Sequence, residues 1–211
     1  MIAVLDYGIG NLRSAQKALE HLGAEARLVT EAGQADGARG VVLPGVGAFG
    51  ACARALRESG LDAVALGALD AGVPFLGVCV GFQLLFEASE EDPEVRGLGV
   101  LAGTVRRLDG SVKLPQMQWN ETRVAPGRSP AMLAPFSAPP WFYYVHSYAP
   151  APEGPARSAV AAVCDYGGEV VAAIEDGNCW GTQFHPEKSG RAGLSLLRAF
   201  LERCEGAGGG D

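Results

Sequence analysis

The chain has 211 residues and a formal net charge of −7, with 48% hydrophobic and 19% charged residues. This composition excludes a disordered chain, and the length suits one large domain with a full hydrophobic core. Acidic residues outnumber basic ones, 24 to 17, whereas nucleic acid and anionic membranes both require a cationic surface. We therefore expect no nucleic-acid partner and no membrane partner.

The first half of the chain alternates short apolar runs with helical patterns. Strands are predicted over 2–5, 26–29, 40–43 and 74–78, and helices over about 12–22, 48–58, 61–71 and 80–87. Asn11 is a candidate cap for the first helix. Such alternation predicts a mostly parallel sheet with right-handed crossovers and helices on both faces, which is the α/β class.

The second half has a different pattern, because Gly and Pro separate short strand-like runs. These runs cover 103–108, 141–145, 159–164, 170–174 and 179–183, with a proline-rich loop over 125–140. The pattern favours antiparallel strands at a sheet edge or in a flap. A helix is predicted over 190–204. We expect a single domain over 1–204 and a frayed Gly-rich tail over 205–211.

The cysteines give one candidate nucleophile and argue against disulfides. The five are Cys52, Cys79, Cys164, Cys179 and Cys204. Their number is odd and no pair has C-x-x-C spacing, so neither a disulfide framework nor a zinc site is expected. The N-terminal segment also does not resemble a signal peptide. We expect a cytoplasmic protein without a metal or cofactor.

Cys79 lies in Gly77-Val78-Cys79-Val80-Gly81, between an apolar strand and a predicted helix. A nucleophile elbow requires this order of elements, and small flanking residues permit its strained turn. The N-terminus of the following helix would favour a thiolate. The alternative is a buried structural cysteine, which is the interpretation for the other four.

A thiol nucleophile requires a base, and the chain has three histidines. His21 is placed near the end of a helix and His146 follows a strand, whereas His185 begins His185-Pro186-Glu187 after the last predicted strand. In an extended chain, residues two apart project to the same side, so Glu187 can orient the imidazole of His185. Cys79, His185 and Glu187 therefore form a candidate triad.

Acyl transfer also requires N–H donors for the developing oxyanion. The N–H of Val80 follows the nucleophile, and the second donor is expected from the loop 44–50, through Val46 or Gly47. The same loop contains Gly45-x-Gly47-x-x-Gly50, which matches the dinucleotide fingerprint. That fingerprint belongs after a first strand with an acidic residue about 20 positions on, so nucleotide binding is disfavoured.

Taken together, these residues resemble the class I, or triad, glutamine amidotransferases, which have a flavodoxin-like sheet. Within that class the chain is most similar to the glutaminase subunits of imidazole glycerol phosphate synthases. The matching segments span nearly the whole chain and are 6–14, 44–50, 77–85, 145–148 and 183–189.

The resemblance implies that glutamine is the substrate and that Cys79 forms a glutamyl thioester. His185 would protonate the departing ammonia and then activate water. Gln83 matches the family position that holds glutamine, and Ser147 and Tyr148 match positions near its α-carboxylate.

The resemblance also implies a partner, a separate TIM-barrel cyclase subunit that forms a heterodimer with this chain. In histidine biosynthesis that cyclase uses the ammonia to convert PRFAR into imidazole glycerol phosphate and AICAR, and its ligand stimulates the glutaminase. Asn11, Trp119 and Asn120 would lie at the interface. The family typically has Pro-His-Met-Gly-Trp-Asn where this chain has Gln116 and Gln118, so the local turn is expected to differ.

Two other functions are consistent with some of these residues. One is a glutaminase that serves another synthase, such as that of pyridoxal phosphate, although the segment 6–14 argues against it. The other is a non-catalytic redox-sensing protein with a reactive elbow cysteine, for which neither His-Pro-Glu nor Gln83 is needed.

Overall fold

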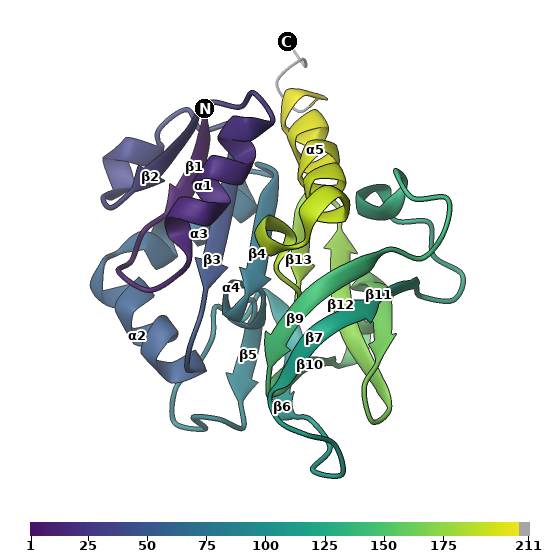
Figure 1. Ribbon diagram of the computed structural model, residues 1–211. Coiled ribbons are helices and arrows are strands. Elements are labelled where there is room, and N and C mark those ends of the chain that lie inside the picture. The colour runs from purple at the N-terminus through teal and green to yellow at the C-terminus, as the bar shows by residue number, and fades with distance from the viewer. Residues whose placement is uncertain (207–211) are drawn as a thin grey trace.

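An eight-stranded sheet forms the centre of the computed structural model, which describes residues 1–206 (Figure 1). The strand order is β2-β1-β3-β4-β13-β12-β11-β8. The first five are parallel, and the last three continue the sheet in antiparallel pairing. The strands are β1 Ile2–Leu5, β2 Ala26–Val29, β3 Gly40–Gly45, β4 Phe75–Cys79, β8 Arg123–Val124, β11 Val160–Asp165, β12 Glu169–Asp176 and β13 Cys179–Thr182. The sheet confirms the predicted α/β class.

Helices cover both faces of this sheet. They are α1 Leu12–His21, α2 Phe49–Glu58, α3 Leu61–Asp70 and α5 Gly190–Gly206. The chain moves in opposite directions across the sheet from β1 to β2 and from β3 to β4, so right-handed crossovers put α1 and the α2–α3 pair on opposite faces. Helix α5 returns beside α1 (Figure 1).

The second half adds two small sheets beside the central one. Strand β6, Leu101–Arg107, pairs with β5, Phe86–Ser89, and with β10, Tyr148–Pro152. Strands β7, Gln116–Glu121, and β9, Trp141–His146, form an antiparallel ribbon (Figure 1). Sequence analysis missed β5, β7, β8 and β10. Two of these have unfavourable strand sequences, since β7 is rich in amides and β10 contains two prolines.

Three expectations about helix ends were wrong. The helix predicted over 80–87 is one turn only, α4 Val80–Gln83, because Phe86 instead pairs with Leu101 in the small sheet. Asn11 occupies the cap position of α1 but its side chain makes no capping hydrogen bond. Helix α5 includes two residues of the predicted tail, 205 and 206; the rest of that tail, 207–211, lies outside the described residues.

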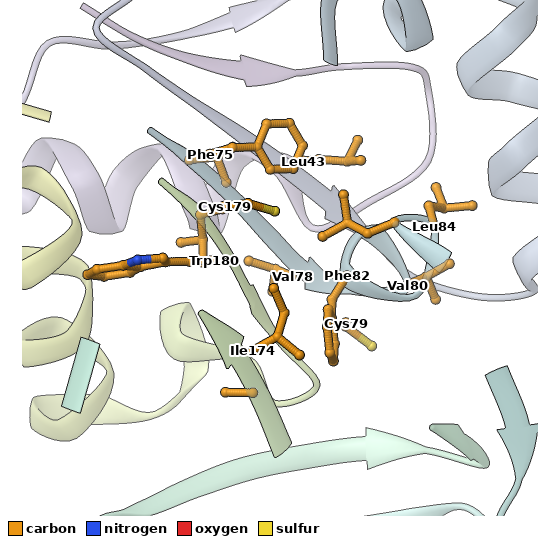
Figure 2. Close-up of a cluster of buried hydrophobic side chains, with 14 of the residues drawn as sticks. Leu43, Phe75, Val78, Cys79, Val80, Phe82, Leu84, Ile174, Cys179 and Trp180 are labelled. Atoms are coloured by element: carbon orange, nitrogen blue, oxygen red, sulfur yellow. The ribbon is translucent and has the colours of Figure 1, made fainter. Parts of the chain in front are cut away.

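The core packs large side chains around the junction between β4 and α4. Figure 2 shows Phe82, Val80 and Val78 beside Cys79, and it shows Trp180 of β13 further away in the same core. Gly181 makes room for this packing, because a Cβ there would lie 2.2 Å from the ring of Phe82. All five cysteines fall within residues 1–206; each is buried and none forms a disulfide. No helix among these residues is long and apolar enough to cross a membrane.

Candidate active site

Cys79 is the last residue of β4 and has φ 55° and ψ −112°. Among residues 1–206 it is the one non-glycine residue with positive φ. A Cβ-bearing residue is strained in this region, and such strain is typical of nucleophile elbows. The turn directs the chain from the central strand straight into α4, so the thiol is held at the carboxyl end of the parallel strands.

The two glycines of the elbow are required by close packing. A Cβ on Gly81 would lie 1.8 Å from the carbonyl oxygen of Leu43, and one on Gly77 would lie 2.9 Å from that of Gly81. Because these neighbours are backbone atoms of the adjacent strand or of the elbow itself, they have no room to move. The G-x-C-x-G spacing therefore reflects two contacts, that of Gly81 with β3 and that of Gly77 with the start of α4.

His185 and Glu187 lie beside the elbow and are bonded to each other. Nδ1 of His185 lies 2.8 Å from a carboxylate oxygen of Glu187. Sequence analysis expected an extended chain here, but the two side chains meet across a 3₁₀ turn, Pro186–Lys188. The turn follows β13, which neighbours β4, so the topology puts His185 next to Cys79.

Electrostatics couple His185 to Cys79. Burial lowers the pKa of His185, but the interactions of the imidazole with the thiol of Cys79 and with the carboxylate of Glu187 outweigh it and raise the pKa to about 9. Nε2 has no partner within normal hydrogen-bond length, so we interpret the interaction with the thiol as a close approach. The sulfur also receives a weak hydrogen bond from Nε2 of Gln183 at 3.8 Å.

A cavity of about 550 Å³ opens over Cys79 and His185. Its volume suits a small-molecule substrate. Several of the remaining predicted site residues line it: Asn11, Val46, Gly47, Val80, Gln83, Ser147 and Tyr148. Segments from both halves of the chain therefore converge on one cavity.

The candidate oxyanion donors belong to two of these segments. Val46 and Gly47 follow β3, and Val80 follows Cys79 on α4. Sequence analysis expected the dipole of a longer helix to stabilise a thiolate at Cys79. Because α4 has a single turn, it does not provide the dipole of a longer helix. The individual N–H groups of the loop and the elbow are the available donors.

Gln83 is buried and hydrogen-bonded, not an exposed helix residue. Its amide nitrogen donates to the carbonyl oxygen of Tyr148 at 2.9 Å and to Oε1 of Gln183 at 3.0 Å. Both amide protons are thereby used, and its own Oε1 stays available as an acceptor. Gln183 thus bridges Gln83 and Cys79, a role that sequence analysis did not assign.

Sequence analysis also missed Glu91, which lines the cavity and accepts a hydrogen bond of 2.8 Å from the N–H of Phe49. It lies in an acidic loop that the sequence shows as Glu90-Glu91-Asp92, but nothing in that run marks the residue that faces the site. Lys188 and His146 line the cavity as well. Burial lowers the pKa of His146 to about 4, so its imidazole is neutral at pH 7.

The three predicted interface residues are not equivalent in the structure. Asn11 lies at the cavity. The amide of Asn120 is bonded within the chain, to the carbonyl oxygen of Asp165 at 2.9 Å. Trp119 is 48% exposed, and its ring contacts that of Tyr143 edge-on.

The structure thus combines an α/β fold with a strained cysteine elbow and a buried His–Glu pair in one cavity. Residues 3–204 match the family described as class-I glutamine amidotransferase, and the chain belongs to that family. Solved structures with the same fold include one described as a glutamine amidotransferase, with a TM-score of 0.75, 22% identity and 97% and 98% of the two chains covered. At this identity the likeness supports the fold alone.

Curated relatives with higher sequence identity to this chain share one name. A protein of Moorella thermoacetica named imidazole glycerol phosphate synthase subunit HisH is 44% identical over 98% of this chain and 97% of its own length. Proteins of the same name from Methanothermobacter thermautotrophicus and Thermosynechococcus vestitus are 44% and 45% identical, over 95–98% of both chains. The similarity is thus continuous along nearly the full length.

Proposed function

We propose that the chain hydrolyses glutamine to glutamate and ammonia and is the glutaminase subunit of an imidazole glycerol phosphate synthase. The observation that carries this proposal is the convergence of the strained Cys79 elbow with the buried His185–Glu187 pair in one cavity. The near full-length similarity to synthase subunits of that name supports the choice of synthase.

The chemistry follows from these groups. The thiolate of Cys79 attacks the side-chain amide carbon of glutamine, and N–H groups of Val80 and of the loop at Val46 and Gly47 stabilise the oxyanion. The imidazolium of His185 gives its proton to the departing nitrogen, which leaves as ammonia and a glutamyl thioester remains. His185 then takes a proton from water, whose oxygen attacks the thioester to release glutamate and the thiol.

Substrate selection uses the two ends of glutamine. Glu91 provides a carboxylate in the cavity for the α-ammonium group, and we propose that backbone N–H groups of Ser147 and Tyr148, which line the same cavity, bind the α-carboxylate. Oε1 of Gln83 is an unused acceptor at the reacting end. The cavity thus offers acceptors for the cation and donors for the anion of an amino acid.

A partner is proposed from an exposed apolar face of the β7–β9 ribbon. Met117, Trp119 and Trp141 are 63%, 48% and 54% exposed, and the strand register puts all three on the same face. Val145 belongs to this face and also lines the cavity. Because free ammonia would escape into water, a subunit that covers this face and receives the ammonia is required. We propose that it is the TIM-barrel cyclase of histidine biosynthesis.

The first experiment is glutamate release from glutamine, measured for the chain alone and with the cyclase subunit and its ribonucleotide ligand. Little activity alone and a large increase with both would support a partner-dependent glutaminase. High activity alone would contradict the dependence on the cyclase. No glutamate under any condition, with Cys79 reduced, would contradict the proposed reaction.

A further inference from the structure

Two buried side chains hold the loop that follows β3, and neither belongs to the triad. The hydroxyl of Tyr7 donates a hydrogen bond of 2.6 Å to the carbonyl oxygen of Pro44. The thiol of Cys52 donates one of 3.2 Å to the carbonyl oxygen of Val46. Tyr7 follows β1 and lies 37 residues before Pro44, whereas Cys52 is on α2, only six residues beyond Val46. They bond two carbonyl groups two residues apart, Pro44 near the end of β3 and Val46 at the start of the loop.

Peptide geometry connects these bonds to the active site. In a planar trans peptide the C=O and the next N–H point in opposite directions. A Val46 carbonyl held toward the buried thiol of Cys52 therefore directs the N–H of Gly47 away from the interior. Gly47 is exposed and lines the cavity over Cys79, so this N–H is directed to the side where substrate binds.

Close packing ties the same loop to the elbow. A Cβ on Gly45 would lie 2.9 Å from the hydroxyl oxygen of Tyr7 and 2.6 Å from the backbone nitrogen of Gly81. The loop is thus enclosed between Tyr7 and the nucleophile turn. Burial raises the pKa of Tyr7 and of Cys52 above their ordinary values, so both groups stay protonated and act as donors.

We propose that Tyr7 and Cys52 are positioning residues, which hold the loop so that its N–H groups face the oxyanion formed at Cys79. The inference rests on the glutaminase function proposed above. It predicts a specific defect, because the loop donors contribute only when negative charge develops on the amide oxygen. Loss of either anchor should slow turnover more than it weakens glutamine binding.

The test compares Cys52→Ala, Cys52→Ser and Tyr7→Phe with the unmodified chain, each combined with the cyclase subunit and its ligand. One neutral hydrogen bond corresponds to roughly a 3- to 10-fold change, so we expect kcat to fall by about that factor in Cys52→Ala and Tyr7→Phe. KM for glutamine should change by less than about twofold. Cys52→Ser keeps a donor to Val46 and should retain most of kcat.

A second readout separates positioning from collapse of the elbow. Alkylation of Cys79 by iodoacetamide consumes the thiolate without forming an oxyanion, so its rate should be unchanged in all three variants. Cys204→Ala is the matched control, because it also removes a buried helical thiol, at a position outside the cavity lining. It should leave both reactions unchanged.

Each result bears on the inference. Unchanged kcat in both Cys52→Ala and Tyr7→Phe overturns it, and so does a parallel fall in turnover and alkylation. If Tyr7→Phe does not fold, the Cys52→Ala and Cys52→Ser pair decides alone. Failure of the unmodified chain to release glutamate rejects the proposed function and this inference together, whereas normal turnover in every variant rejects the inference only.

Discussion

Glu187 holds His185 through a 2.8 Å contact between a carboxylate oxygen and Nδ1, although the two side chains are only 4% and 2% exposed. Since the carboxylate accepts the Nδ1 proton, Nε2 is the nitrogen left for Cys79. The same contact helps to raise the pKa of His185 to about 9 against the effect of burial. The contact with Glu187 therefore affects both the orientation and the charge of the His185 imidazole.

Glu187→Gln is expected to reduce kcat by on the order of a hundredfold or more, because the neutral amide neither stabilises imidazolium nor enforces one tautomer. The measurement is glutamate release by the complex as a function of pH. Glu202→Gln, on an exposed part of α5, is the control and should behave like the unmodified chain. Equal activity in the two variants would remove Glu187 from the proposed triad.

Cys79→Ala is expected to abolish synthesis that depends on glutamine while sparing synthesis that depends on added ammonia. The reason is that the variant removes the nucleophile but leaves the partner's own reaction intact. Product formation by the complex is measured with each nitrogen source. Residual glutaminase activity in Cys79→Ala would show that the nucleophile lies elsewhere.

His185→Asn should stop turnover, since no group remains to protonate the departing ammonia or to activate water. A glutamine-like electrophile is still expected to label Cys79, but more slowly. Mass spectrometry of the labelled chain over time gives the rate. Full turnover by His185→Asn would exclude this histidine from the mechanism.

The neutral state of His146 predicts a pH dependence of stability. Its pKa is lowered from 6.5 to about 4 in the folded chain, so the unfolded chain binds the proton more readily between these values. Stability should therefore fall as pH decreases from 6.5 to 4, by at most on the order of 3 kcal/mol from this group. His185 stays protonated in the folded chain over this range because its pKa is raised to about 9. In the unfolded chain it becomes fully protonated only below pH 6.5, so it adds a small slope of opposite sign that is confined to pH values near 6.5.

Urea unfolding at pH 6.5 and at pH 4.5 tests this prediction. His146→Asn keeps a side-chain donor but removes the titrating group, so its free energy of unfolding should decrease less between the two pH values than that of the unmodified chain. The carboxylates titrate in both proteins, so they contribute the same change in the free energy of unfolding to each. Identical decreases would contradict a neutral buried His146.

Trp119→Ala should weaken binding of the cyclase subunit by about 30-fold or more, which corresponds to about 2 kcal/mol for a central aromatic contact. The side chain is 48% exposed, so the fold should tolerate its removal. Titration calorimetry measures the affinity. Val124→Ala removes an exposed apolar side chain from β8, outside the proposed interface, and should not change it. An unaltered affinity in Trp119→Ala would move the interface elsewhere.

The parallel half of the fold and the candidate triad could be predicted from local patterns in the amino-acid sequence. Apolar runs that alternate with amphipathic helices predict parallel pairing of the strands. The Cys79 elbow and His185-Pro186-Glu187 are local patterns with few alternative explanations. These signals depend on neighbours in the chain, which is why the strands β1 and β2 were predicted with their observed bounds.

The remote groups that reach the cavity became evident only from the packing of the folded chain. Glu91, Gln183 and Tyr7 owe their positions to strand order and to packing between distant segments. The bonded pairs Tyr7–Pro44, Glu91–Phe49 and Gln183–Cys79 are 37, 42 and 104 residues apart. Tertiary structure also ended α4 after one turn, because pairing of Phe86 with Leu101 outweighs local helix propensity. Long-range contacts of this kind leave no periodic mark in the chain, so the sequence alone does not reveal them.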